Sequence, residues 1–526
     1  MSWTHYIVVP VVLPLAAGCI ALLLEPRWPR AAARLSVAVS WALLALAGYL
    51  ATIAASGVVT PYLLGNWRAP FGIALALDRL SALMLVLTAV VAVGAALYAR
   101  GGGHGSGGGA HDARGRHFHA LFQFQLMGLN GAFLTADLFN LFVFFEVLLI
   151  ASYGLLLHGG GARRLRASIH YVVFNLTGST LFLIAVALLY GLTGTLNMAD
   201  LALRVPVVAA QHPAQVQAAA LILIVVFGVK AALLPLYFWL PDTYSAATAP
   251  AAALFAIMTK VGVYCIARVT TLVFGAEAGG AADVAYPWLP ALAMATLVLA
   301  TFGALAAYRL RLLVAYLVVS SAGTLLLAVG LGSAPAVGAA LFYLINSTLV
   351  AAALFLLIDS IACARGEARD WMVPAPLAYR AAYGALFFLV AAEAASVPPL
   401  GGFLGKSLLL AAVVGEPMAG AVWIVVLATG LGIIVALARA GSTVFWEATA
   451  ANRMQMAAAR PAVSQRAALA WLTVAIIATV FNAGPVGGYT GAAAAQLLQR
   501  HGYIEAVLGA EPVTPLWNPR AGAIKP

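Results

Sequence analysis

The sequence predicts an all-α polytopic membrane protein with about fourteen transmembrane helices. Hydrophobic residues make up 64% of the 526 residues and charged residues only 9%, whereas soluble proteins are roughly half apolar and a quarter charged. The apolar residues also form continuous runs of about 20 residues, the length that crosses a hydrocarbon core of about 30 Å. Because these runs do not alternate between apolar and polar residues, an outer-membrane β-barrel is excluded.

The apolar runs follow one another along most of the chain with short loops between them. They fall near residues 4–24, 33–55, 73–99, 118–136, 138–158, 167–193, 214–239, 246–274, 288–307, 311–332, 335–363, 380–413, 419–445 and 465–484. The first run lacks a preceding basic region and a cleavage site, so we expect it to be a retained helix.

Arginines are concentrated in every second loop between these runs. The odd loops carry Arg27, Arg30, Arg114, Arg116, Arg163, Arg164, Arg166, Arg309, Arg311, Arg365, Arg369, Arg453 and Arg460, while the seventh loop, Leu240 to Tyr244, is too short to carry any. By the positive-inside rule the odd loops are cytoplasmic and both termini lie on the periplasmic side. The net charge of +11 is spread over these loops, which argues against nucleic-acid binding.

Prolines are expected to break two of the predicted helices. Pro235 interrupts the seventh run, and Pro398 and Pro399 interrupt the twelfth, because proline lacks the backbone donor that a helix needs. A lysine stands before the first break and after the second, which fits two inverted five-helix repeats. We therefore expect segments 1–117, 118–274, 288–445 and 446–526, the second and third being the repeats and the last a helix followed by a polar tail.

Three of the four lysines lie inside apolar runs. These are Lys230, Lys260 and Lys406, whereas the loops use arginine. Burying a lysine at the centre of a bilayer costs about 2.5 to 3.5 kcal/mol on insertion scales, so such residues are usually functional. Lysine can lose its proton in an apolar site and arginine effectively cannot, so these lysines are candidates for a proton relay.

One acidic residue, Glu146, lies near the middle of the fifth run without a charged neighbour. A lysine from another helix would be its natural partner, and Lys230 is the best candidate, because a buried glutamate and lysine stabilise each other's charged forms. Such a pair could act as a switch. The alternative is a neutral glutamic acid in a structural hydrogen bond.

Further polar residues could complete a proton path. Asn346, Ser347 and Thr348 stand together in the eleventh run, either as part of the path or as hydrogen-bonding groups between packed helices. Glu393 precedes Lys406 by thirteen residues; it could face the same path or pair with an arginine. Asp359 is expected at a membrane interface.

Several motifs are absent. The sequence has no Walker motif, dinucleotide fingerprint, CxxC or haem-spaced histidine pair, so we expect no cofactor, no metal and no enzymatic activity. Gly101 to His119 contains four histidines, yet its many glycines favour a flexible loop over a metal site. Cys19, Cys265 and Cys363 lack pairing or metal spacing and are expected in the core.

Three long motifs resemble one known family. DLFNLFVFFEVLLIASYGLLLHG, FGVKAALLPLYFWLPDTYSAATAPAAALFAIMTKVGVYCIAR and PPLGGFLGK are similar to the antiporter-like subunits of respiratory complex I and of the Mrp (Pha) cation/proton antiporters, and most of all to the D-type subunits of the Mrp antiporters. The similar region runs from about Leu75 to Val413.

The resemblance implies fourteen helices, two inverted repeats and a central hydrophilic axis. It places the family's functional glutamate at Glu146 and its functional lysines at Lys230, Lys260 and Lys406, while Asn346 stands where a histidine is expected. Asparagine cannot titrate, so water must complete the path there or that step is altered.

The function implied is that of a secondary transporter subunit in the bacterial inner membrane, exchanging Na⁺ or another monovalent cation for protons within a hetero-oligomeric complex. The alternative is a proton-pumping subunit of complex I or of a membrane-bound hydrogenase.

Overall fold

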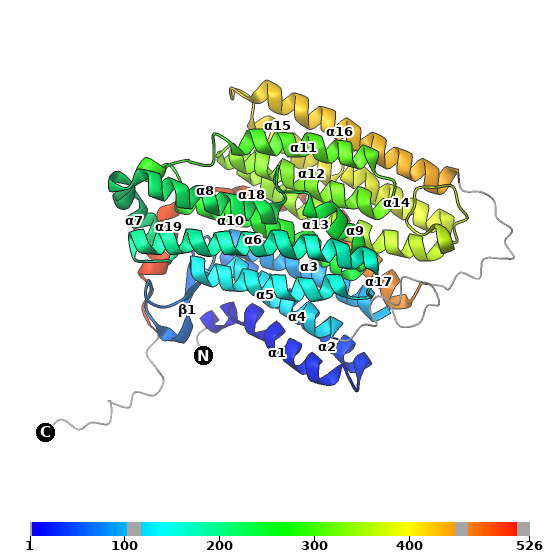
Figure 1. Ribbon diagram of the computed structural model, residues 1–526, viewed down its shortest axis with the longest axis horizontal. Helices are drawn as coiled ribbons and strands as arrows, with labels where there is room; N and C mark the ends of the chain where they lie inside the picture. Colours follow the sequence, from blue (N-terminus) through cyan, green and yellow to red (C-terminus); the bar gives the residue numbers. More distant parts are fainter. Residues whose placement is uncertain (1–2, 102–116, 448–460, 513–526) are drawn as a thin grey trace.

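The computed structural model describes residues 3–101, 117–447 and 461–512. Most of this part of the chain is helical, and the axes of most helices are roughly parallel to one another (Figure 1). Eleven of the described helices are long and apolar enough to cross a membrane, and α1 and α15 are shorter apolar helices. The all-α membrane fold is therefore confirmed, whereas the total of fourteen spans and the inverted repeats stay predictions.

The helices and strands follow one another along the chain with short connections. The α-helices are α1 (Val9–Leu24), α2 (Pro29–Ala54), α3 (Arg79–Gly101), α4 (Phe118–Leu134), α5 (Leu138–Leu157), α6 (Ala162–Thr193), α7 (Met198–Gln211), α8 (Pro213–Ala231), α9 (Trp239–Ala246), α10 (Ala249–Leu272), α11 (Leu289–Ala306), α12 (Leu310–Gly330), α13 (Ala334–Ala364), α14 (Arg380–Ala394), α15 (Gly401–Ala412), α16 (Ala419–Gly441), α17 (Val463–Phe481), α18 (Ala483–Leu498) and α19 (Arg500–Leu508). Short helical turns occur at Trp3–Ile7, Leu64–Asn66, Gly279–Ala281, Gly366–Ala368 and Ser442–Trp446. The strands β1 (Thr60–Leu63) and β2 (Ala74–Leu77) form an antiparallel hairpin in which Thr60 faces Leu77.

Each of the fourteen apolar runs contains at least one of these helices, but four helices, α7, α9, α18 and α19, lie almost entirely outside them. α9 occupies the stretch expected as the short seventh loop, Leu240 to Tyr244. α7 begins after Asn197, whose side chain accepts hydrogen bonds from the backbone N–H groups of Ala199 and Asp200, a typical helix cap. α18 and α19 occupy the region expected to be largely a polar tail. One helix was expected in segment 446–526, whereas α17, α18 and α19 lie there, and α19 falls in the stretch from about residue 497 that was expected to be polar and only partly ordered.

Both proline breaks are present. α8 ends at Ala231, and the next residue, Ala232, has a left-handed backbone with φ of +57°. The following helix, α9, begins at Trp239. α14 ends at Ala394, and α15 starts only at Gly401. Lys230 thus lies in the last turn before one break, and Lys406 lies in the second turn after the other.

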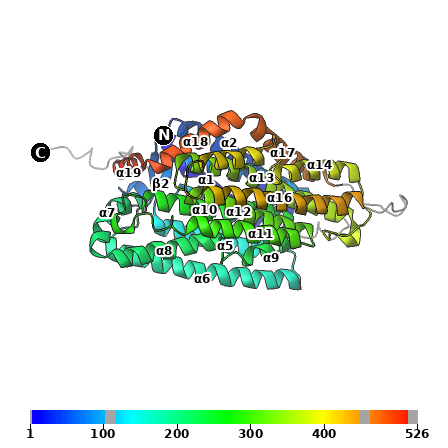
Figure 2. The ribbon, with the colours of Figure 1, turned by 90° about the horizontal axis from the view of Figure 1, so that it is seen from above.

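Helix α10 is the centre of the molecule, since every one of its residues is buried. It packs against α3, α8, α12 and α13, so it contacts both the segment before it and the segment after it. Figure 2 shows α10, α12 and α13 in the middle of the bundle. Because this 24-residue helix is buried on all sides, Lys260 in its middle is enclosed by other helices.

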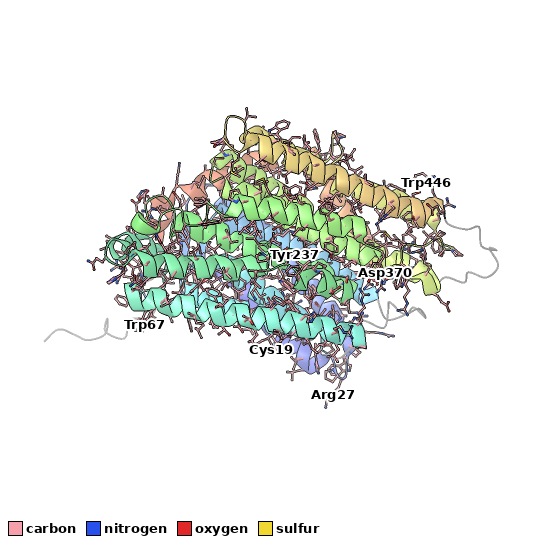
Figure 3. All side chains as sticks on the ribbon, turned by 45° about the horizontal axis from the view of Figure 1, so that its top comes forward. Cys19, Arg27, Trp67, Tyr237, Asp370 and Trp446 are labelled. Atoms are coloured by element: carbon pink, nitrogen blue, oxygen red, sulfur yellow. The ribbon has the colours of Figure 1, made fainter. Side chains whose placement is uncertain are left out.

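The two ends of the helix bundle differ in the loops that they carry. The N-terminal helix begins, and α19 ends, at the end where the β-hairpin lies (Figure 1). Trp67, in the second loop, lies at this end, whereas Asp370 and Trp446 lie at the other (Figure 3). The fifth, seventh, ninth and eleventh loops meet in one cavity, so the short seventh loop joins the arginine-bearing loops. Which end is cytoplasmic stays a prediction.

The cysteines only partly match their expected burial. Cys265 is buried in α10, but Cys19 and Cys363 are exposed. Apolar runs of a membrane protein have a lipid-facing side, so position in such a run does not by itself place a residue in the core. Most of the histidine-containing glycine-rich segment lies outside the described residues.

Candidate functional site

Lys230 is buried at the C-terminal end of α8, with 5% of its surface exposed. Its Nζ donates a hydrogen bond to Asn175 Oδ1 on α6 over 2.9 Å. The same Nζ lies 5.6 Å from the centre of the Phe145 ring, a cation–π distance. Because α8 stops at the next residue, the negative end of the helix dipole also faces this amine. Lys230 is therefore held by neutral partners in this conformation and not by an ion pair.

Glu146 directly follows Phe145 on α5 and is half-buried. Its Oε1 atom is buried and has no hydrogen-bond partner among the described residues. The carboxylate is close enough to Lys230 for an electrostatic interaction, yet the two groups form no salt bridge in this conformation. The direct contact expected between Glu146 and Lys230 is thus replaced by the contact from Lys230 to Asn175.

Lys260 is completely buried in the middle of α10. Its Nζ donates to Ser321 Oγ on α12 over 2.8 Å, and the Ser321 hydroxyl donates onward to the Val318 carbonyl at 2.7 Å. Two residues further along α10, Gly262 allows close contact with the end of α8. A Cβ atom there would lie 2.5 Å from the Ala231 nitrogen, so only glycine lets these helices approach as they do.

A cavity of about 20 Å³ lies beyond Ser321. Its polar lining comes from three helices and consists of Ser320, Ser321, Tyr343, Asn346, Ser347 and Glu393. A polar cavity of this size has room for about one water molecule. The cavity therefore joins the hydrogen-bond partner of Lys260 to Asn346 and Glu393.

Asn346 and Glu393 face each other across this cavity, with 1% and 2% of their surfaces exposed. In the amide orientation that satisfies both ends, Asn346 donates to Glu393 Oε2 at 3.1 Å and accepts from the Gly402 N–H at 3.0 Å. The Gly402 N–H also lies 3.2 Å from Glu393 Oε2. Glu393 thus binds the N-terminus of α15, where a carboxylate is favoured, and it pairs with no arginine among the described residues.

The remaining predicted residues are less connected. Lys406 is half-buried on α15, makes no hydrogen bond or ion pair with any described residue, and does not line the small cavity. The Thr348 hydroxyl donates to the Leu344 carbonyl of its own helix at 2.7 Å. The structure therefore brings Lys260, Asn346, Ser347 and Glu393 together and leaves Lys406 to one side.

Two partner residues were missed by the reasoning from sequence. Asn175 and Ser321 hold the amines of Lys230 and Lys260, and each is a small polar residue within an apolar run. That pattern was noticed only for Asn346 to Thr348, because those three residues are adjacent.

A second buried basic residue, Arg268, was also missed on α10. Its Nη2 forms a 2.6 Å salt bridge with Asp78 Oδ2. Its guanidinium lies 5.4 Å from the Tyr264 ring and 5.1 Å from the Tyr503 ring of α19. Its spacing of eight residues from Lys260, which places both on one face of a helix, could have indicated it.

Comparison with known proteins identifies the family. Residues 135–432 match the model of the family described as NADH:quinone oxidoreductase/Mrp antiporter, transmembrane. The D subunit of a probable K⁺/H⁺ antiporter from Rhizobium meliloti is 39% identical, over 99% of each chain. The D subunit of the Na⁺/H⁺ antiporter from Bacillus subtilis is 35% identical, over 76% of this chain and 79% of that one.

Solved structures agree. A chain of the Mrp complex from Dietzia sp. DQ12-45-1b superposes with a TM-score of 0.85 and 27% identity, covering 97% of this chain and 100% of that one. A chain of respiratory complex I from Thermus thermophilus gives a TM-score of 0.73 at 25% identity, covering 93% and 99%. The chain therefore belongs to the NADH:quinone oxidoreductase/Mrp antiporter family and, within it, to the D-type subunits of the Mrp antiporters.

Proposed function

We propose that this chain is the proton-translocating subunit of a multisubunit antiporter that exchanges a monovalent cation for protons across the bacterial inner membrane. The relatives that support this proposal are named as K⁺/H⁺ and Na⁺/H⁺ antiporter subunits, so either cation is a candidate. The similar chain in the Mrp complex belongs to an assembly, and we expect this chain likewise to work with other membrane subunits. It carries no redox or nucleotide motif, so an ion gradient drives the exchange.

The observation that carries the proposal is the polar connection from Lys260 to Glu393. Lys260 donates to Ser321, and the cavity beyond Ser321 reaches both Asn346 and Glu393. A water in that cavity would bridge these groups and pass a proton between them. Asn346 cannot titrate, so in this mechanism it orients Glu393 and the water accepts the proton.

Neutral partners suit a relay of this kind. Lys230 and Lys260 donate to an amide oxygen and to a hydroxyl, so no carboxylate fixes either amine in its charged form. A lysine in such a site can exist with or without its proton, whereas one in a tight ion pair stays charged. Lys406 would be the last station, reached when α15 or the solvent around it rearranges.

Glu146 would act as the switch. In this conformation its carboxylate makes no salt bridge and Lys230 bonds to Asn175. When Lys230 turns to Glu146 instead, the pair holds the proton on the lysine. When the pair opens, as in this structure, the proton is released toward Lys260. Motion of one side chain would thereby control transfer along the path.

Everted membrane vesicles from an antiporter-deficient strain expressing the whole operon provide the test. Glu146→Ala and Lys230→Ala should leave the complex assembled but abolish the pH change that follows addition of Na⁺, K⁺ or Li⁺. Glu416→Ala, at an exposed loop glutamate, is the matched control and should transport normally. Normal antiport in both Glu146→Ala and Lys230→Ala would rule out this mechanism, and the ion series identifies the cation.

A further inference from the structure

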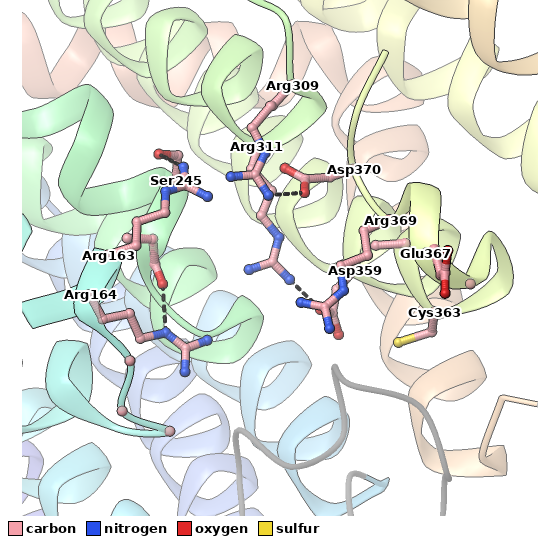
Figure 4. A pocket seen from close by; sticks show the side chains of 16 residues that line it. Arg163, Arg164, Ser245, Arg309, Arg311, Asp359, Cys363, Glu367, Arg369 and Asp370 are labelled. Carbon is pink, nitrogen blue, oxygen red and sulfur yellow. Dashed lines mark hydrogen bonds and ion pairs between the residues drawn. The ribbon is translucent and has the colours of Figure 1, made fainter. Parts of the chain in front are cut away.

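A cluster of charged side chains lies outside the lysine path, at the end that carries the basic loops. A cavity of about 640 Å³ opens there between the loops that follow α5, α9 and α13 and the start of α12. Five arginines and three carboxylates line it (Figure 4): Arg163, Arg164, Arg309, Arg311, Arg369, Asp359, Glu367 and Asp370. The lining therefore carries an excess of two positive charges.

Two of the carboxylates are already neutralised within the lining. Arg309 binds Asp370 at 2.7 Å, and Arg311 binds Asp359. Arg164 donates to the carbonyls of Ala246 and His158 at 2.8 and 2.9 Å. These contacts hold the wall of the cavity in shape and use up the donors of Arg164 and Arg311.

Two arginines of the lining keep donors that a ligand could use. Arg163 makes one bond, to Ser245 Oγ at 3.0 Å. The Arg369 side chain is exposed and forms no hydrogen bond or ion pair with any described residue. Arg309 is not one of them, because its Nη2 binds Asp370 and its Nε, which has no partner among the described residues, is buried out of reach of a ligand. The side chains of Arg163 and Arg369 come from the first turn of α6 and from the loop after α13, and they line the same cavity.

We propose that this cavity is a binding site for a phosphate group. One carboxylate presents two oxygens and satisfies one guanidinium fork, whereas a phosphate presents oxygens in several directions and can accept from several arginines together. A cavity of 640 Å³ also has the volume typical of small-ligand sites. Its positive charge repels Na⁺ and K⁺, so the transported cation does not enter here.

Two sources could supply this phosphate. The cavity lies at the end of the membrane helices, where an anionic phospholipid headgroup could reach it, since basic pockets between membrane helices bind such headgroups. A soluble phosphate could enter from the water. The guanidinium chemistry is the same for both, so the experiment must compare them.

Cys363 offers a readout inside the cavity. Its thiol is exposed and lies in the lining, so a ligand in the cavity should slow its reaction with a neutral maleimide. The measurement uses the purified complex in detergent, with Cys19→Ser in the background because Cys19 is also exposed. Short-chain phosphatidylglycerol is titrated in one arm and inorganic phosphate in the other.

We expect saturable protection of Cys363 in at least one arm. Arg163→Gln combined with Arg369→Gln should weaken that protection about tenfold or more, because two charge-assisted contacts are lost. Neither residue makes a salt bridge, so the variant should fold normally. The control is Arg27→Gln with Arg30→Gln, two exposed arginines of the first loop, and it should bind like the wild type.

The outcomes separate the possibilities. Protection by phosphatidylglycerol alone identifies a lipid site, and protection by inorganic phosphate identifies a soluble anion. Either result supports the proposal if the cavity variant is weakened and the control is not. The absence of protection in both arms, or equal protection in the cavity variant, overturns it.

Discussion

Helix α10 carries two buried basic residues, Lys260 and Arg268, whose surroundings are opposite in kind. Their surfaces are 0% and 4% exposed, so both are removed from water. Lys260 donates to the neutral hydroxyl of Ser321. Arg268 is paired with Asp78 and lies between two tyrosine rings. The burial is the same and the partners differ.

The difference follows from what each side chain can do. A buried guanidinium keeps its charge, so it needs a carboxylate nearby, and Asp78 supplies it. A buried amine can give up its proton, so a neutral acceptor is sufficient. The charge near Arg268 is therefore constant, whereas the charge at Lys260 can change. This contrast is the structural basis for placing the relay at the lysine.

Replacing Lys260 with arginine should have the largest effect on transport. Lys260→Arg keeps a positive charge of similar length but removes the ability to release a proton, so cation-dependent proton movement should be lost in everted vesicles. The reciprocal change, Arg268→Lys, keeps the charge next to Asp78 and should retain most of the transport. If Lys260→Arg transported at the wild-type rate, Lys260 would not need to titrate.

Removing the charge at Arg268 should destabilise the protein more than removing the charge at Lys260. Arg268→Met leaves the buried Asp78 carboxylate without its partner and should cost about 3 to 5 kcal/mol. Lys260→Met leaves Ser321 bonded to the Val318 carbonyl and should cost only about 1 kcal/mol. Thermal unfolding of the purified chain in detergent measures both.

The double variant Arg268→Met with Asp78→Leu serves as the control for this comparison. It removes both charges, so it should recover most of the loss seen in Arg268→Met alone. Equal destabilisation by Arg268→Met and Lys260→Met would contradict the distinction between a fixed and a changeable charge.

Much of the fold could be predicted because hydrophobicity alone determines it. Each apolar run contains a helix, and Pro235, Pro398 and Pro399 lie at interruptions, since both features depend on local chemistry. Helices α7, α9, α18 and α19 were not predicted as helices, because they are short or rich in small and polar residues and lack the continuous hydrophobicity used to find spans. Their positions depend on contacts with distant parts of the chain, such as that of Tyr503 with Arg268.

The site could be predicted only in part, for a similar reason. An ionisable residue within an apolar run is visible in the sequence, so Glu146 and the three lysines could be predicted as candidates. The partner of each depends on which helices meet and on rotamers, which no local pattern specifies. Glu146 was therefore expected to pair with Lys230, whereas in this structure Lys230 donates its hydrogen bond to Asn175. The sequence left open whether Glu393 faces the proton path or pairs with an arginine. The break before α15 brings the Gly402 N–H to the Glu393 carboxylate, and no sequence pattern indicates that contact.

The smallest effect is expected at the end of the molecule where α19 lies, at the ion pair of Arg500 with Glu277. Glu277 is in the segment between α10 and α11, its side chain is 53% exposed, and His501 Nε2 lies 3.3 Å from its other oxygen. The hydrogen bond from Arg500 holds the pKa of the Glu277 carboxyl below its ordinary value of 4.5. A carboxyl whose pKa is lowered by folding stabilises the folded state above that ordinary value, and this contribution is lost as the pH falls through the lowered pKa.

Glu277→Gln should accordingly lower the thermal midpoint slightly at pH 7 and have no effect in acid below the lowered pKa. The decrease should be small because solvent screens an exposed pair. Glu505→Gln removes an exposed acid of α19 that makes no ion pair among the described residues, and it should leave the midpoint unchanged at both pH values. A midpoint difference for Glu277→Gln that persisted in acid would show that the side chain supports α19 by packing and not by charge. The contrast with Arg268 would then sharpen, because the buried pair would be the only one of the two whose charge matters.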